Sequence, residues 1–196
     1  MNRLVPTAVA FALAASASPA VAQATDPAVS TVNTLHGGLL NIMRARGTHA
    51  SRAQSIGPVV DRTFDLPLMT RLAVGPSWTT IPAPQQAALV RAFRALTVSQ
   101  YAKNFDAFGG ERFVFGGIEA RGADKLVKTT LQSGSTRESL NYRLRNSGGQ
   151  WKIVDVYYRN AISQLATRRA DFARVLKTGG APALVAHLNR LAARAG

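Results

Sequence analysis

The chain has 196 residues and no cysteine, and its 24 lysines and arginines outnumber 10 acidic residues, for a formal net charge of +14. The lack of cysteine excludes disulfides, thiol catalysis and cysteine-based zinc sites. The length allows one domain with a packed core, and the positive charge predicts attraction to polyanions such as anionic membrane surfaces.

The first 22 residues have the three parts of a secretory signal peptide. Arg3 provides a positive start, residues 4–17 are apolar, and Ala20-Val21-Ala22 matches the small-x-small pattern of a cleavage site. The apolar run is shorter than the roughly 20 residues that span a bilayer, and no later segment is long and apolar enough. We therefore expect export to the periplasm, removal of residues 1–22, and a single domain over residues 23–196. A retained N-terminal anchor is the alternative. Export also argues against a nucleic-acid partner.

Residues 27–108 have the apolar spacing of helices. The first helix is expected over residues 27–46, with Pro27 in its first turn. A second is expected over residues 52–61, with an interruption near Gly57-Pro58.

Two further helices are expected before the period changes. A short one follows Phe64 and closes at Gly75, where Gly75-Pro76-Ser77-Trp78 forms a turn. The longest helix runs over about residues 84–105 and has a broad apolar face.

After Gly110 the apolar period becomes two, which is typical of strands. Four strands, over residues 111–119, 125–133, 137–145 and 151–158, are expected to form an antiparallel meander across residues 111–158. In the third strand we expect Leu140, Tyr142 and Leu144 to share one face, and Asn141, Arg143 and Arg145 to face water.

Residues 161–194 return to helical spacing. One helix is expected from Ile162 to Gly179-Gly180, and Pro182 begins a last one. The order of helices, strands and helices predicts an α+β fold. A curved antiparallel sheet of about four strands would pack against the N-terminal and C-terminal helices, with an apolar cavity between the two layers.

Residue patterns for catalysis are sparse. His36, His49 and His187 share no metal-ligand spacing, and we expect isolated surface or packing histidines. The sequence lacks a nucleophile elbow, a phosphate loop and a dinucleotide fingerprint. We therefore expect no catalytic residue, no metal site and no cofactor.

The acidic residues are expected to pair with arginines. Asp61 and Asp65 are close in the sequence, as are Glu111 and Glu119, but so few acids in a basic chain favour ion pairs over acid–base catalysis. Asp155 lies inside an apolar strand, where a buried carboxylate needs a partner. We expect a structural ion pair between Asp155 and either Arg168 or Arg169.

Several segments, taken in order, carry a family resemblance: Phe64-Asp65-Leu66 and Gly75-x-x-Trp78, Gln85-Gln86 with Phe93 and Tyr101, Trp151-Lys152-Ile153-Val154-Asp155-Val156, and Ile162-Ser163-Gln164-Leu165 before Gly179-Gly180. Their order and spacing resemble the MlaC/toluene-tolerance (Ttg2-type) family of periplasmic phospholipid-binding proteins over about residues 28–192. Arg62-Thr63-Phe64, Asn104-Phe105-Asp106 and Gly110-Glu111-Arg112-Phe113 are most similar to its hopanoid-associated HpnM branch.

The resemblance implies an NTF2-like curved sheet and an apolar pocket for the tails of a phospholipid or hopanoid. It also implies a carrier that touches membrane surfaces transiently. Such a carrier moves lipid between an outer-membrane lipoprotein complex and an inner-membrane MCE-domain protein of an Mla-like ABC transporter. It brings no catalytic residues. A non-catalytic accessory factor of hopanoid biosynthesis and a non-lipid interaction module are the alternatives.

The residues expected to line or border the pocket are apolar or aromatic and come from all three parts of the domain. They are Met69, Leu72, Trp78, Phe93, Leu96, Leu140, Tyr142, Val154, Val156, Tyr158 and Ile162.

Overall fold

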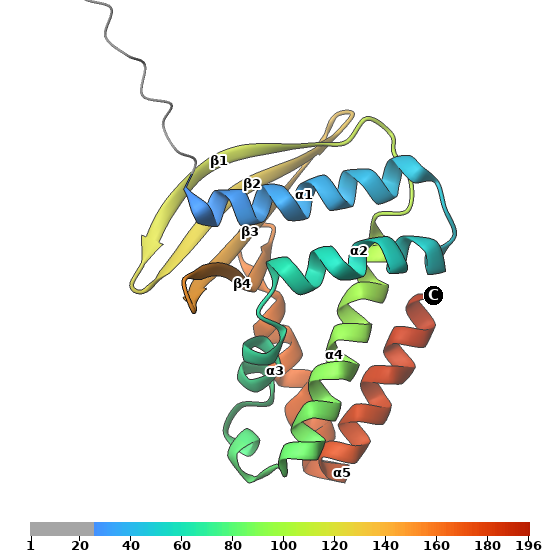
Figure 1. The fold of residues 1–196 in the computed structure, drawn as a ribbon, viewed down its shortest axis with the longest axis vertical. Helices are drawn as coiled ribbons and strands as arrows, with labels where there is room; N and C mark the ends of the chain where they lie inside the picture. Colours follow the sequence, from blue (N-terminus) through green and yellow to red (C-terminus); the bar gives the residue numbers. More distant parts are fainter. Residues whose placement is uncertain (1–25) are drawn as a thin grey trace, which may run out of the picture.

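The computed structural model describes residues 26–196, and the predicted signal peptide lies outside them. Helix α1 (Pro27–Ala45) runs along one face of a curled antiparallel sheet, while the later helices gather below the sheet (Figure 1). Within residues 26–196, no helix combines the length and the apolar character needed to cross a membrane.

Side-chain caps fix the starts of the first helices. The Asp26 carboxylate accepts a hydrogen bond from the Ala28 N–H at 2.9 Å, at the start of α1. Thr48 caps α2 (His49–Thr63) in the same way, by accepting from the Ser51 N–H. Each cap satisfies a backbone donor that a helix start leaves without a partner.

Helix α2 is longer than predicted and passes through Pro58 without a break, so the expected interruption is wrong. Proline removes one helical hydrogen bond. Ile56 and Val60 lie on either side of Pro58, and both are fully buried against the core. Their packing outweighs the local loss, as tertiary contacts often outweigh helix propensity.

The next elements lead to the longest unbroken helix. Helix α3 (Leu66–Val74) begins at Asp65, whose carboxylate accepts from the Leu68 N–H, and is followed by a 3₁₀ turn, η1 (Gly75–Thr80). Helix α4 (Ala83–Asn104) then packs side by side with the C-terminal helix α5 (Gln164–Ala195).

The sheet has the strand order β1-β2-β3-β4-β5, with every neighbouring pair antiparallel. The strands are β1 (Arg112–Arg121), β2 (Asp124–Ser133), β3 (Thr136–Ser147), β4 (Gln150–Tyr158) and β5 (Ile162–Ser163). This arrangement confirms the predicted α+β fold. The sequence analysis missed β5 and expected Ile162 at a helix start.

The side chain of Asn141 in β3 differs from the prediction. Asn141 is buried rather than facing water, because its amide accepts from the Thr129 N–H and donates to Asn160. The two predicted C-terminal helices meet, as expected, at Gly179-Gly180: the element α5 is broken there by a kink, and Gly180 has the non-helical φ of 64° and ψ of −163°.

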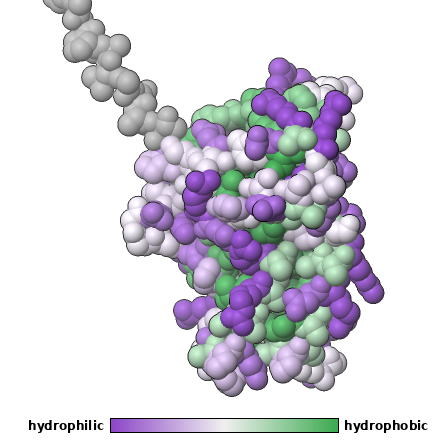
Figure 2. Space-filling view, turned by 45° about the vertical axis from the view of Figure 1, so that its right-hand side comes forward, coloured by the Kyte–Doolittle hydropathy of each residue, from purple (hydrophilic) through white to green (hydrophobic). Residues whose placement is uncertain are grey.

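The core lies between α1, the sheet and the lower helices. It contains Leu35 and Leu39 of α1, Val127 and Leu144 of the sheet, and Leu184 of α5, all with no exposed surface. On the face shown in Figure 2, hydrophobic areas lie between hydrophilic side chains rather than in one broad patch.

Candidate functional site

A cavity of about 580 Å³ lies between the sheet and the helices α4 and α5. Its volume is within the range of small-molecule sites. The lining side chains are mostly apolar or aromatic, with a few polar and charged groups. They are Phe64, Met69, Phe93, Thr97, Gln100, Tyr101, Asn104, Phe105, Leu131, Glu138, Leu140, Tyr142, Val156, Tyr158, Gln164, Leu165 and Arg168.

Two cross-strand pairs build the sheet wall of the cavity. Leu140 of β3 lies opposite Tyr158 of β4, and Tyr142 lies opposite Val156. Side chains two residues apart in a strand share a face, and directly paired residues of neighbouring strands do too. The four side chains therefore present one continuous apolar surface to the cavity.

Aromatic contacts hold the opposite wall. The ring of Phe93 meets that of Phe172 edge-on, with centroids 6.0 Å apart. Tyr101 lies between Phe64 and Phe105, with centroids 5.7 and 5.9 Å away. Burial raises the pKa of the Tyr101 hydroxyl, so this ring stays neutral.

Polar side chains collect where α4 meets the start of α5. Thr97, Gln100 and Asn104 share one face of α4 because they are three and four residues apart. Gln164 and Arg168 are one turn apart on α5. The Arg168 Nη2 donates a hydrogen bond to Gln100 Oε1, which joins the two helices at the cavity.

Six of the eleven predicted pocket residues line the cavity: Met69, Phe93, Leu140, Tyr142, Val156 and Tyr158. The other five lie outside its lining. Leu96 and Val154 are core residues with 1 % exposure each, Leu72 and Trp78 are half-buried, and Ile162 is 49 % exposed. Contact between lipid and any of the eleven stays a prediction.

The polar members of the lining were missed by the sequence analysis. Gln100 and Asn104 lie at helical spacing, as do Gln164 and Arg168, but such pairs occur on any solvated helix face. Only the packing of α4 against α5 shows that these two faces meet at a cavity.

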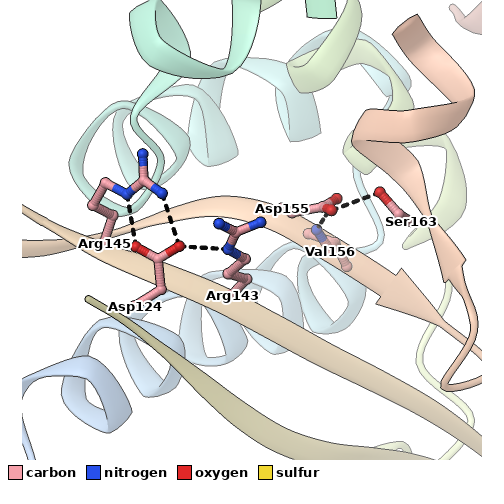
Figure 3. Close-up of polar contacts among 6 residues, drawn as sticks. All are labelled: Asp124, Arg143, Arg145, Asp155, Val156 and Ser163. Atoms are coloured by element: carbon pink, nitrogen blue, oxygen red, sulfur yellow. Dashed lines mark hydrogen bonds and ion pairs between the residues drawn. The ribbon is translucent and has the colours of Figure 1, made fainter. Parts of the chain in front are cut away.

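Asp155 does not form the predicted ion pair with Arg168 or Arg169. Its carboxylate accepts hydrogen bonds from the Ser163 Oγ at 2.6 Å and the Val156 N–H at 2.8 Å (Figure 3). It also accepts from the Leu165 N–H at 3.0 Å. Backbone and hydroxyl donors thus satisfy this buried charge. The contacts tie β4 to the first turn of α5, directly before Arg168.

Two ion pairs of the sheet share the carboxylate of Asp124. Its carboxylate accepts from the Arg143 Nε at 2.5 Å, and from the Arg145 Nε and Nη2 at 2.6 and 2.9 Å (Figure 3). Hydrogen bonds from Arg145, and then from Arg143, lower the pKa of Asp124 against the opposing effect of burial. The two arginines, predicted to face water, are half-buried and join β2 to β3.

Other acidic side chains have partners away from the cavity. Asp61 pairs with Arg94 at 2.7 Å and Glu119 with Arg121 at 3.0 Å, as expected for the acids. Asp65 and Glu111 instead accept hydrogen bonds from the hydroxyls of Ser147 and Ser133, so the expected pairing with arginine is wrong for these two. His187 lies 2.8 Å from an Asp171 oxygen. Across residues 26–196, no group of three histidine, aspartate or glutamate side chains has a metal-binding arrangement.

The fold and the cavity define a class of small α+β proteins that hold a ligand between a curled antiparallel sheet and packed helices. Residues 34–190 match the family model described as MlaC protein, and the chain belongs to the MlaC family.

One solved structure shows the same fold. The phospholipid-binding protein from Ralstonia solanacearum, solved in complex with a phospholipid, is 21 % identical to this chain, with a TM-score of 0.75. The alignment covers 86 % of this chain and 96 % of that one. No curated protein matches the sequence.

Proposed function

We propose that this protein is a periplasmic carrier that holds the tails of a phospholipid in the cavity between α4, α5 and the sheet. The observation that carries the proposal is the cavity itself, which is lined by Leu140, Tyr142, Val156 and Tyr158 on the sheet side. A solved structure with this fold, from Ralstonia solanacearum, contains a phospholipid. The predicted signal peptide supports the periplasmic location.

The tails would be retained by the hydrophobic effect. Removing one methylene group from water contributes about 0.8 kcal/mol, so even part of two acyl chains supplies strong binding. The headgroup would stay near the polar edge of the cavity. No covalent chemistry is needed, which is why we propose a carrier and not an enzyme.

Lipid extraction and mass spectrometry of the mature protein test this proposal. Native mass spectrometry of protein from a periplasmic extract is expected to show about one phospholipid per chain. A protein that carries no lipid when it is isolated from the periplasmic extract, and still binds none after incubation with phospholipid and hopanoid, would contradict the proposal and favour an interaction module.

A single substitution tests the location of the site. Leu140→Arg places a charge in the apolar wall and is expected to reduce lipid occupancy by at least tenfold. Val114→Arg, on an exposed position of β1, is the matched control and should keep wild-type occupancy. A folded Leu140→Arg protein with normal occupancy would show that the lipid lies elsewhere.

The identity of the bound lipid tests the resemblance to the HpnM branch. Co-purification of a hopanoid in place of a phospholipid would support the resemblance to that branch and a role in hopanoid movement or synthesis. Recovery of phospholipid alone, from cells that make hopanoids, would assign the chain to phospholipid transport.

The partners follow from the family resemblance. We propose that the carrier moves lipid between an outer-membrane lipoprotein complex and an inner-membrane MCE-domain protein of an ABC transporter, and that exposed arginines assist docking. Affinity for the MCE-domain protein should then fall between 0.05 and 0.5 M salt, roughly the range over which the Debye length shrinks from above 10 Å to below it. Affinity that is unchanged across this range would exclude an electrostatic contribution.

A further inference from the structure

The cavity lining contains two charged side chains, and only one of them is neutralised by a partner. Glu138 accepts hydrogen bonds from the Arg159 Nη2 at 3.0 Å and the Arg159 Nε at 3.1 Å. Arg168, on the helical side, forms no ion pair with any carboxylate among residues 26–196. The lining therefore carries one positive charge with no carboxylate within ion-pair distance, although Asp171 exerts a favourable Coulombic effect on Arg168.

Most of the Arg168 donors are free to meet a ligand. A guanidinium has five N–H groups, and the one protein acceptor of Arg168 is Gln100 Oε1. Among residues 26–196, no fully buried side-chain nitrogen or oxygen lacks a hydrogen-bond partner. The Arg168 nitrogens that bond no protein atom must therefore reach open space, and Arg168 lines the cavity.

The surroundings of Arg168 favour an anion. Burial lowers the pKa of its guanidinium, which means that the half-buried site disfavours the positive charge. A negatively charged group placed there would offset that cost and accept the free N–H groups in short, charge-assisted hydrogen bonds.

The amide side chains of the lining also lie on the helical side of the cavity, whereas Glu138 lies on β3. Gln100 and Asn104 of α4 and Gln164 of α5 line the wall that contains Arg168, whereas Leu140 and Val156 line the sheet wall. A ligand that fits both walls is amphipathic, with an oxyanion close to its tails.

We infer that Arg168 binds the oxyanion of the cargo lipid, the phosphodiester of a phospholipid, and that Gln100 is a positioning residue for the guanidinium. The inference rests on the proposed function and deepens it: the carrier selects lipids with an anionic group next to the tails over uncharged lipids of the same chain length.

Competition among lipids with identical tails tests this selectivity. Delipidated protein is mixed with equal amounts of dioleoyl phosphatidylglycerol and dioleoylglycerol, and native mass spectrometry measures the bound ratio. Wild type is expected to prefer the phospholipid by about tenfold to a hundredfold, the contribution of hydrogen bonds to a charged group. Equal occupancy by the two lipids would overturn the inference while leaving the carrier function intact. Binding of neither lipid would instead contradict the carrier function.

Two neighbouring arginines provide a matched pair of variants. Arg168→Gln should abolish the preference, and Arg169→Gln, which removes the same charge from an exposed position outside the lining, should retain it. Gln100→Leu should weaken the preference without removing it. Since the charge of Arg168 is disfavoured in the empty protein, Arg168→Gln should unfold at the same temperature as wild type or higher. An Arg168→Gln protein with the full preference would overturn the inference.

Two further arms identify the source of the oxyanion. Wild type should also prefer oleate, which has a carboxylate, over oleyl alcohol, which has the same single tail and no charge, and Arg168→Gln should show a smaller preference. Inorganic phosphate alone should leave the melting temperature of wild type unchanged. A stabilisation by phosphate alone that Arg168→Gln removes would overturn the lipid assignment of this site.

Discussion

The imidazole of His36 stacks on the ring of Phe113, with ring centroids 3.7 Å apart and ring planes inclined by 7°. Its Nε2 lies 3.1 Å from the hydroxyl oxygen of Tyr142. This packing histidine is 6 % exposed and joins α1 to β1 and β3 beside the cavity. The sequence analysis had expected a surface or packing residue, and packing is what the structure shows.

The burial of His36 predicts a loss of stability in mild acid. Burial lowers the pKa of its imidazole to about 3 from an ordinary value of 6.5. His36 therefore binds a proton near pH 6.5 in the unfolded chain, but only near pH 3 in the folded chain. Because protons bind the unfolded state preferentially between these values, the free energy of unfolding falls as the pH falls from 6.5 to 3. Between pH 6.5 and 4.5 this residue should account for about 2 kcal/mol.

Urea titrations of wild type and His36→Gln at several pH values in that window measure the effect. Glutamine keeps a polar partner for Tyr142 and does not titrate, so the variant should have a flatter profile. Both proteins contain the same carboxyl groups, so the contribution of these groups cancels in the difference between the two profiles. Parallel profiles for the two proteins would show that His36 is protonated in the folded state.

The carboxylate of Asp124 predicts a large cost for its removal. Its side chain is 2 % exposed, and Asp124→Asn leaves two half-buried guanidinium groups without their charge partner. We expect a loss of about 2–3 kcal/mol in the free energy of unfolding. Asp61→Asn breaks a pair in which both side chains are more than 40 % exposed, and should cost less than about 1 kcal/mol. Equal losses in denaturant titrations would contradict this ranking.

The three hydrogen bonds of Asp155 predict a coupled loss of stability and ligand retention. Asp155→Ala leaves the Leu165 N–H without its acceptor and should cost about 2 kcal/mol. Since the same contacts hold the first turn of α5, lipid dissociation from the variant should also be faster. Ser163→Ala removes the Ser163 Oγ donor and the helix cap, but leaves the Leu165 contact. It should have a smaller effect on lipid dissociation, and the reverse order would be inconsistent with this role.

The kink of α5 requires glycine at position 180. Its φ of 64° and ψ of −163° lie in a region that is essentially restricted to glycine. Gly180→Ala should therefore destabilise the protein by about 1–3 kcal/mol. Gly37→Ala is the control, because an added methyl group meets no atom within 4 Å there and the helix is regular. That variant should be as stable as wild type or slightly more so, by thermal unfolding.

The fold was predictable because its segments have clear periods. The meander was predictable from the alternation of apolar residues in β3 and β4 and from the glycines at 148–149 between them. The glycines at 179–180 predicted the end of a helix. Two features of the fold were not predictable from the sequence. Helix α2 continues past Pro58 because Ile56 and Val60 pack against the core, and the two-residue strand β5 is too short to show an apolar period. Similarly, the apolar wall of the cavity was partly predictable from β3 and β4. The polar lining residues of α4 and α5 were not predictable, since Gln100 and Arg168 meet only through tertiary contacts between these two helices.

The two edges of the sheet differ in a way that bears on self-association. The β4 edge is shielded, because β5 pairs with Tyr157 and Tyr158, and Phe64 bridges to Ile153. Among the described residues, the outer side of β1 has no strand partner, and its exposed side chains include Phe115 at 53 %. A register shift between Phe115 and Gly117 interrupts this edge, and such bulges hinder the docking of a second strand. The irregular middle of β1 therefore disfavours hydrogen bonding between this exposed edge strand and the same strand of a second copy, and so disfavours polymerisation.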